Sequence, residues 1–173
     1  FSKTKINGTS KYATHRYINS NKDMPSVIEG LSNQIEILGI NSSRKPFVDW
    51  LGLKKFNFED LNNKKYFIIN PGCSLKNHQK RWSSKNYAKI CSYLISQNII
   101  PVVIGSKDDN KVINEIESQE SGIFNLLEKS PLDVVYQLSK KSIGAISNDT
   151  GPAHLIASSG CKIHLVLSNF SNI

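Results

Sequence analysis

The residues best suited to chemistry lie at positions 147–154, which read Ser-Asn-Asp-Thr-Gly-Pro-Ala-His. An apolar run at 143–146 precedes them and predicts a short buried strand, and residues 155–160 predict a helix that ends at a glycine. Pro152 suits the first helical position, because the amide that proline lacks would have no partner there. Asp149, Thr150 and Gly151 are therefore expected to form a turn between the carboxyl end of a strand and the amino end of a helix.

Such a turn is suited to binding a phosphorylated sugar. The unpaired amides and positive end of the helix favour an anion such as phosphate, and Gly151 allows a ligand to approach the backbone closely. Asp149 would repel a phosphate, so we expect its carboxylate to accept hydrogen bonds from sugar hydroxyls instead. His154 could donate to an oxygen or brace the loop. Together these residues predict half of a phosphosugar site.

A second candidate loop, Pro71-Gly72-Cys73-Ser74, follows the predicted strand 66–69. Its backbone amides and the Ser74 hydroxyl could cradle a phosphate, and Lys80 would supply the positive charge that a diphosphate leaving group needs. The alternative is a solvated basic loop with one buried tryptophan, Trp82. The loop is not a P-loop, because the Gly-Lys-Ser/Thr ending is missing.

A third loop, Gly105 to Asp109, follows the predicted strand 99–104. An acidic residue just past such a strand commonly accepts hydrogen bonds from ribose hydroxyls, which predicts this role for an acidic residue of the loop. The alternative is that Asp108 and Asp109 only stabilise the first turn of the next helix.

The three loops belong to a regular alternation of strands and helices. One helix is expected after a cap at Ser83 or Ser84, and another after Ser130 as cap and Pro131 at the first position, with Leu132 on its core face. The predicted strands, at 66–69, 99–104, 123–126, 143–146 and 163–167, are continuous apolar runs. Continuous runs indicate a parallel sheet covered on both faces, so the fold class is a doubly wound, Rossmann-like α/β domain.

The rest of the chain sets broader limits. Residues 27–38 have helical apolar spacing that ends at Gly39, and residues 41–64 read as a connector. The net charge of +8 over 173 residues suits a nucleotide, a nucleic acid or an acidic membrane surface, or reflects only a lysine-rich and asparagine-rich surface. No window is long and apolar enough to span a membrane, and three widely spaced cysteines fit a reducing cytoplasm.

Five landmarks in register resemble the C-terminal domain of the heptosyltransferases, glycosyltransferase family nine. They are Pro71-Gly72-Cys73-Ser74, Lys80-Arg81-Trp82, Gly105 to Asp109, Asn125-Leu126 with Leu132, and Asp149 to His154. The resemblance covers about residues 65–168. It implies the donor-binding half of a two-domain GT-B fold, truncated at both ends. Residues 1–40 would then be the tail of the acceptor-side N-terminal domain, 41–64 a connector, and 65–173 the nucleotide-sugar-binding domain.

The resemblance also implies roles. Ser74 and Lys80 would contact the diphosphate, and Thr150 and Gly151 would bind phosphate through their backbone amides. Asp109 would hold the ribose, and Asp149 would hold the sugar. The set of nucleotide-sugar-binding candidates is Ser74, Lys80, Asp109, Asp149, Thr150, Gly151, Pro152 and His154. Asp109 departs from the glutamate that the family more often has there, and Ser83 replaces a proline after Lys-x-Trp.

The activity implied is inverting, metal-independent transfer of heptose from ADP-heptose to the lipopolysaccharide inner core, with no cofactor. The acceptor would be lipid A–core at the inner membrane surface, reached by a cytoplasmic or peripheral enzyme. The catalytic base is expected upstream of Phe1, so this chain alone should bind nucleotide without turnover. The alternatives are a GT-B transferase of another nucleotide sugar, a non-catalytic nucleotide-binding module, and a nucleic-acid binder, which lacks a recognised motif.

Overall fold

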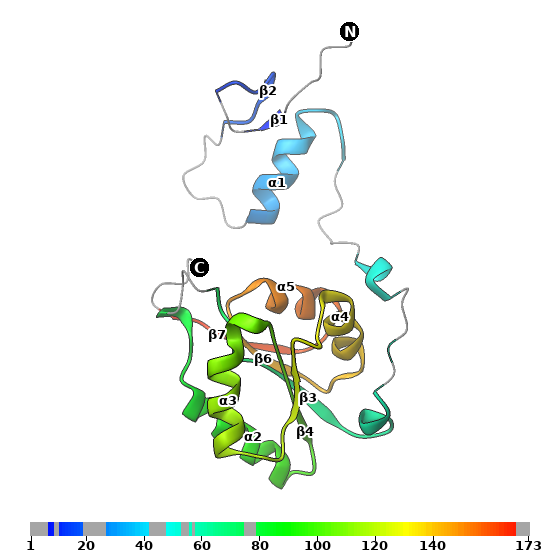
Figure 1. Cartoon of the computed structure of the whole chain (residues 1–173). Coiled ribbons are helices and arrows are strands. Elements are labelled where there is room, and N and C mark those ends of the chain that lie inside the picture. The colour runs from blue at the N-terminus through cyan, green and yellow to red at the C-terminus, as the bar shows by residue number, and fades with distance from the viewer. Residues whose placement is uncertain are drawn as a thin grey trace. The chain divides into compact units, whose positions relative to one another are not determined.

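The computed structural model of the chain describes residues 7–8, 11–18, 27–41, 48–52, 56, 58–74 and 79–168 (Figure 1). The chain divides into two compact units, Phe1–Phe47 and Val48–Ile173. The division falls inside the segment predicted as a connector. Residues 42–47, 53–55 and 57 of that segment lie outside the described residues.

The first unit contains one helix and a short strand pair. Strands β1 (Asn7–Gly8) and β2 (His15–Arg16) pair in parallel. Helix α1 (Val27–Glu36) confirms the helical spacing expected there, and Gly39 follows it in the left-handed conformation, with φ of 73°. Glycine adopts this conformation without strain, and it closes the turn 37–39 that ends the helix two residues before the predicted last position, Leu38.

The second unit is built on a five-stranded parallel sheet in the order β5-β4-β3-β6-β7. The strands are almost continuous apolar runs, and the β-branched residues in them suit a sheet buried on both faces. Their bounds are Tyr66–Asn70 (β3), Ile100–Gly105 (β4), Phe124–Leu127 (β5), Ala145–Asn148 (β6) and Ile163–Val166 (β7). The expected doubly wound α/β fold is confirmed.

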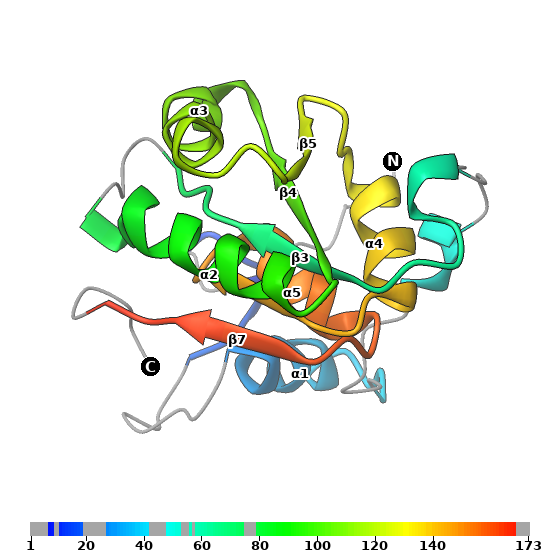
Figure 2. The ribbon, with the colours of Figure 1, turned by 90° about the horizontal axis from the view of Figure 1, so that it is seen from below.

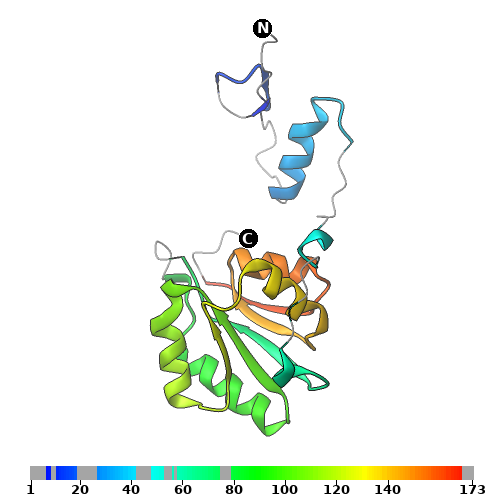
Figure 3. The ribbon, with the colours of Figure 1, turned by 45° about the vertical axis from the view of Figure 1, so that its right-hand side comes forward.

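Helices cover both faces of this sheet (Figure 3). Helices α2 (Ser84–Ser96) and α3 (Asn110–Gln119) pack on one face, around the fully buried Tyr87, Cys91 and Ile113. Helices α4 (Leu132–Lys141) and α5 (Gly151–Ser158) pack on the other, and contribute the buried residues Val134, Val135, Leu138 and Ile156. The Ser83 hydroxyl accepts from the amide of Asn86, so the predicted cap of α2 is also confirmed.

The strand order places a topological switch point between β3 and β6. From β3 the chain moves outward through β4 and β5, and it then returns to add β6 on the other side of β3. The strands are parallel, as the arrows of β3 and β7 in Figure 2 illustrate, so all five carboxyl ends meet at one edge. The helices that follow β3 and β6 lie on opposite faces, which opens a crevice between the two loops.

Three local expectations differ from the structure. Strand β6 begins at Ala145, and Ile143 is 47% exposed, because only residues from 145 onward pair with β7. Ser130 does not cap α4; Pro131 occupies that position, and the Ser130 hydroxyl instead donates to the carbonyl of Leu126. Leu132 is 56% exposed and not part of the core. None of the helices in the described part of the chain is long and apolar enough to span a bilayer.

Candidate functional site

A pocket of about 800 Å³ opens at the carboxyl edge of the sheet. Four loops form its walls: 70–74 after β3, 105–109 after β4, 128–132 after β5 and 149–152 after β6. Six of the eight predicted nucleotide-sugar-binding residues line it: Ser74, Asp109, Asp149, Thr150, Gly151 and Pro152. The three loops singled out in the sequence therefore converge on one cavity, at the switch point where open parallel sheets bind ligands.

The remaining two candidates, Lys80 and His154, contact the pocket through Asp149. The ammonium of Lys80 lies 3.1 Å from Oδ2 of Asp149, and Nε2 of His154 lies 3.9 Å from Oδ1. The side chains of Lys80 and Asp149 are 20% and 24% exposed, so a ligand can reach both. The predicted juxtaposition of a lysine after β3 with an aspartate after β6 is confirmed.

The carboxylate of Asp109 is more fully engaged than the sequence indicated. Its Oδ1 accepts from the amide of Cys73 at 3.3 Å and from Nη2 of Arg81 at 3.0 Å. Its Oδ2 accepts from the amide and the hydroxyl of Ser106, at 3.0 and 2.8 Å, in a capping box. A carboxylate has about four acceptor sites, and all four are used. A ribose hydroxyl could bind Asp109 only by replacing one of these donors.

Gly72 is required by this arrangement. A Cβ on Gly72 would lie 2.8 Å from Oδ2 of Asp109, closer than carbon and oxygen tolerate. Gly151 differs, since a Cβ there would meet no heavy atom of the protein within 4 Å. The protein's own packing therefore requires glycine at position 72 and leaves open space at position 151, where the pocket lies.

The amino end of α5 faces the pocket. Thr150 caps the helix with extended backbone and no side-chain capping bond, while Pro152 lies in the first turn. The Thr150 hydroxyl accepts instead from Nδ2 of Asn70, at 3.0 Å. Pro152 has no amide hydrogen and the amide of Ala153 donates to the carbonyl of Thr150 at 3.0 Å, so an anion in the pocket would meet the amides of Thr150 and Gly151.

Sequence reasoning missed the wall that follows β5. Glu128 lies in the left-handed region with φ of 59°, and its amide donates to the carbonyl of Gly105 at 2.9 Å. Beyond it, Pro131, Leu132 and Val135 give the pocket an apolar side. Leu132 could have indicated this wall in the sequence, because it is an apolar residue in the first turn of a helix that follows the carboxyl end of a strand.

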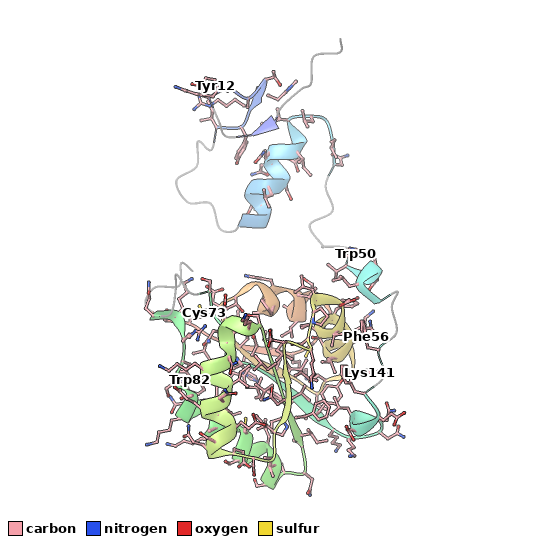
Figure 4. All side chains as sticks on the ribbon, in the orientation of Figure 1. Tyr12, Trp50, Phe56, Cys73, Trp82 and Lys141 are labelled. Atoms are coloured by element: carbon pink, nitrogen blue, oxygen red, sulfur yellow. The ribbon has the colours of Figure 1, made fainter. Side chains whose placement is uncertain are left out.

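The loop between β3 and α2 is anchored by aromatic packing. Trp82 and Tyr87 make an edge-to-face contact with ring centroids 5.2 Å apart, so the Trp82 ring packs against the core but is only partly buried, less than the sequence predicted. Burial raises the pKa of Tyr87 well above its ordinary value, which keeps its hydroxyl protonated as a donor. In Figure 4, Cys73 and Trp82 lie on the left of the second unit, opposite Trp50, Phe56 and Lys141.

The chain is similar to known proteins in both sequence and fold. The model of glycosyltransferase family 9 (heptosyltransferase) matches residues 21–163. Lipooligosaccharide heptosyltransferase 2 of Campylobacter jejuni subsp. jejuni serotype O:2 is 30% identical over 100 residues, which are 56% of this chain and 31% of that protein.

Two solved structures have a similar fold. E. coli ADP-heptose LPS heptosyltransferase II is 25% identical with a TM-score of 0.55, over 60% of this chain and 33% of that one. E. coli heptosyltransferase WaaC, solved with ADP-2-deoxy-2-fluoro heptose, has a TM-score of 0.66 over 91% of this chain and 50% of that one. It is only 14% identical, so that likeness shows the GT-B fold alone. The chain thus spans between 31% and 50% of the length of these relatives.

Proposed function

Because the chain belongs to glycosyltransferase family 9, the heptosyltransferase family, we propose that it binds the donor of a glycosyl transfer reaction. Residues 65–173 would form the nucleotide-sugar-binding domain. The observation that carries this proposal is the pocket at the switch point, where Lys80 and Asp149 lie 3.1 Å apart beside the amino end of α5.

The donor we propose is ADP-heptose. Its support is the family match, together with the likeness to an E. coli ADP-heptose heptosyltransferase at 25% identity. The base and ribose would occupy the side of the pocket with Leu132, Val135 and Asp109. The diphosphate would lie against Ser74 and the amides of Thr150 and Gly151. Mixed walls of this kind are usual for nucleotide sites, which combine apolar surface with a few polar groups.

The proposed transfer step places negative charge on the departing diphosphate, next to positively charged groups of the site. An acceptor hydroxyl forms a bond to the anomeric carbon while a general base takes its proton; the bond to the diphosphate oxygen breaks, and its electron pair leaves with the diphosphate. Lys80 and the positive end of α5 would stabilise that developing charge. Asp149 would accept hydrogen bonds from hydroxyls of the sugar, beside His154, whose Nε2 lies 3.9 Å from the second oxygen of Asp149.

We further propose that residues 1–40 are the tail of an acceptor-side domain and 41–64 the connector. The family match supports this assignment, since it begins at residue 21 and so includes α1. The acceptor we propose is the inner core of lipopolysaccharide, at the inner membrane surface.

A binding titration of the chain tests the donor class. ADP-heptose should bind more tightly than UDP- or GDP-linked sugars, and Lys80→Ala should weaken ADP-heptose binding about tenfold, as expected for loss of a charged contact. Lys85→Ala removes the same charge from an exposed position on α2 and should leave the affinity within about twofold. Preferential binding of a UDP- or GDP-linked sugar would contradict the choice of donor. Equal effects of the two lysine variants would contradict the role of Lys80.

A further inference from the structure

Asn148, the last residue of β6, is fully buried and does not line the pocket. Its Nδ2 donates to the carbonyls of Pro71 and Gly72, at 2.9 and 3.2 Å. Its Oδ1 accepts from the amide of Trp82 at 3.1 Å and from the hydroxyl of Tyr87 at 3.0 Å. A side-chain amide offers two donors and two acceptor lone pairs, so all four are satisfied.

The partners allow only one orientation of this amide. The two carbonyls can only accept and the amide of Trp82 can only donate, so exchanging the nitrogen and oxygen of Asn148 would break three of the four bonds. All four partners lie between Pro71 and Tyr87, in the loop after β3 and the start of α2. Asn148 therefore fixes the end of β6 to the neighbouring loop at a defined distance.

A second asparagine makes the reciprocal connection. Asn70 ends β3 and is 3% exposed, and its Nδ2 donates to the hydroxyls of Ser147 and Thr150 at 2.7 and 3.0 Å. Each of the two adjacent strands thus ends in an asparagine that bonds to the segment following the other. Buried polar groups that are fully hydrogen-bonded rigidify the backbone around them.

Given the donor site proposed above, we infer that Asn148 is a positioning residue for the donor diphosphate. It holds loop 71–74, which carries Ser74, at a fixed separation from the amides of Thr150 and Gly151, so that both loops can bind one diphosphate. Asn70 also lines the pocket and could touch a ligand directly, whereas Asn148 can act only through the loops it connects.

The variant Asn148→Asp tests this role, because it keeps the shape and both acceptors while losing both donors. The carboxylate would face the carbonyls of Pro71 and Gly72 and push the loop away. We expect the affinity of the chain for ADP to fall at least about tenfold, since small displacements of binding groups are costly. The affinity for adenosine, which has no phosphates, should stay within about twofold. A purely structural defect would weaken both ligands alike.

Tyr66→Phe is the matched control. It removes a buried hydrogen bond of 2.8 Å, from the Tyr66 hydroxyl to the carbonyl of Leu138, at the amino end of the same sheet. At temperatures where Tyr66→Phe is folded, its affinities for ADP and for adenosine should equal those of the unaltered chain. Tyr87→Phe is the milder second variant: it removes one donor to Asn148 and should weaken ADP by a few-fold, with adenosine unchanged.

Amide hydrogen exchange without ligand separates failure of this inference from failure of the proposed function. In Asn148→Asp, the hydrogen-bonded amides of Cys73 and Trp82 should exchange faster while those of β4 stay protected. Unchanged exchange of these two amides, or equal losses of ADP and adenosine affinity, would overturn the positioning role. If the unaltered chain binds no ADP, the proposed function is wrong, and the exchange result alone decides whether Asn148 couples the loops.

Discussion

At the scale of single residues, two consecutive basic side chains connect the loops of the pocket. Lys80 pairs with Asp149 and Arg81 with Asp109, so one short segment reaches the loops after both β6 and β4. Ion pairs as accessible as Lys80–Asp149 typically contribute about 0–1 kcal/mol to stability. The value of this pair is therefore in placing a cation and a sugar-binding carboxylate side by side.

The two glycines of the site lead to opposite predictions. Gly151→Ala places a methyl group in open space, so stability should stay the same or rise by about 0.4–1 kcal/mol. Its ADP affinity should nevertheless fall about tenfold, because the methyl group would occupy the space of the phosphate.

Gly72→Ala should instead cost about 1–3 kcal/mol of unfolding free energy, because its Cβ meets Asp109. Thermal melts and calorimetric titration check both, and a Gly151→Ala variant with unchanged ADP affinity would place the ligand elsewhere.

Asp149 and Lys80 could be predicted from the sequence, whereas the role of Asn148 depends on tertiary contacts. Asp149 stands out because it lies in the glycine-containing turn between a strand and a helix, and Lys80 because it adds a positive charge to the loop that follows Pro71-Gly72-Cys73-Ser74. Asn148 does not, since its four bonds depend on which strand lies next to β6. The engagement of Asp109 by Arg81 likewise depends on tertiary contacts that no local pattern encodes.

At the scale of elements, the strands were predictable and the start of α4 was not. Continuous apolar runs in β3 and β4 identify buried parallel strands whatever their order. A Ser-Pro pair before α4 favours a serine cap, but the Ser130 hydroxyl bonds to Leu126 and to the amide of Gly105. Helical spacing placed Leu132 on the core face, whereas the first turn of α4 lies beyond the edge of the sheet and lines the pocket.

At the scale of the whole molecule, stability should decline in alkaline solution. Burial raises the pKa of Cys91 from 9.0 to about 12 and that of Tyr66 from 10.0 to about 12. The folded state therefore holds both protons at pH values where the unfolded chain has released them. The resulting stabilisation is complete below pH 9.0 and is lost as pH rises through about 12.

Urea unfolding at about pH 8 and about pH 10.5 measures this effect. The unfolding midpoint should fall between the two, and the fall should be smaller in the double variant Cys91→Ala, Tyr66→Phe. A pH dependence that is identical in the double variant would mean that other groups control alkaline unfolding.

The central claim is that one edge of the sheet binds both the diphosphate and the sugar of a nucleotide-sugar donor. Calorimetric titration of Asp149→Asn with ADP and with ADP-heptose tests it most directly. The variant removes a negative charge beside the diphosphate, so ADP should bind as well as before or more tightly. ADP-heptose should lose about tenfold relative to ADP, because the sugar loses its charged acceptor. Equal weakening of both ligands, or no change in either, would contradict the assignment of Asp149 to the sugar and of this pocket to the donor.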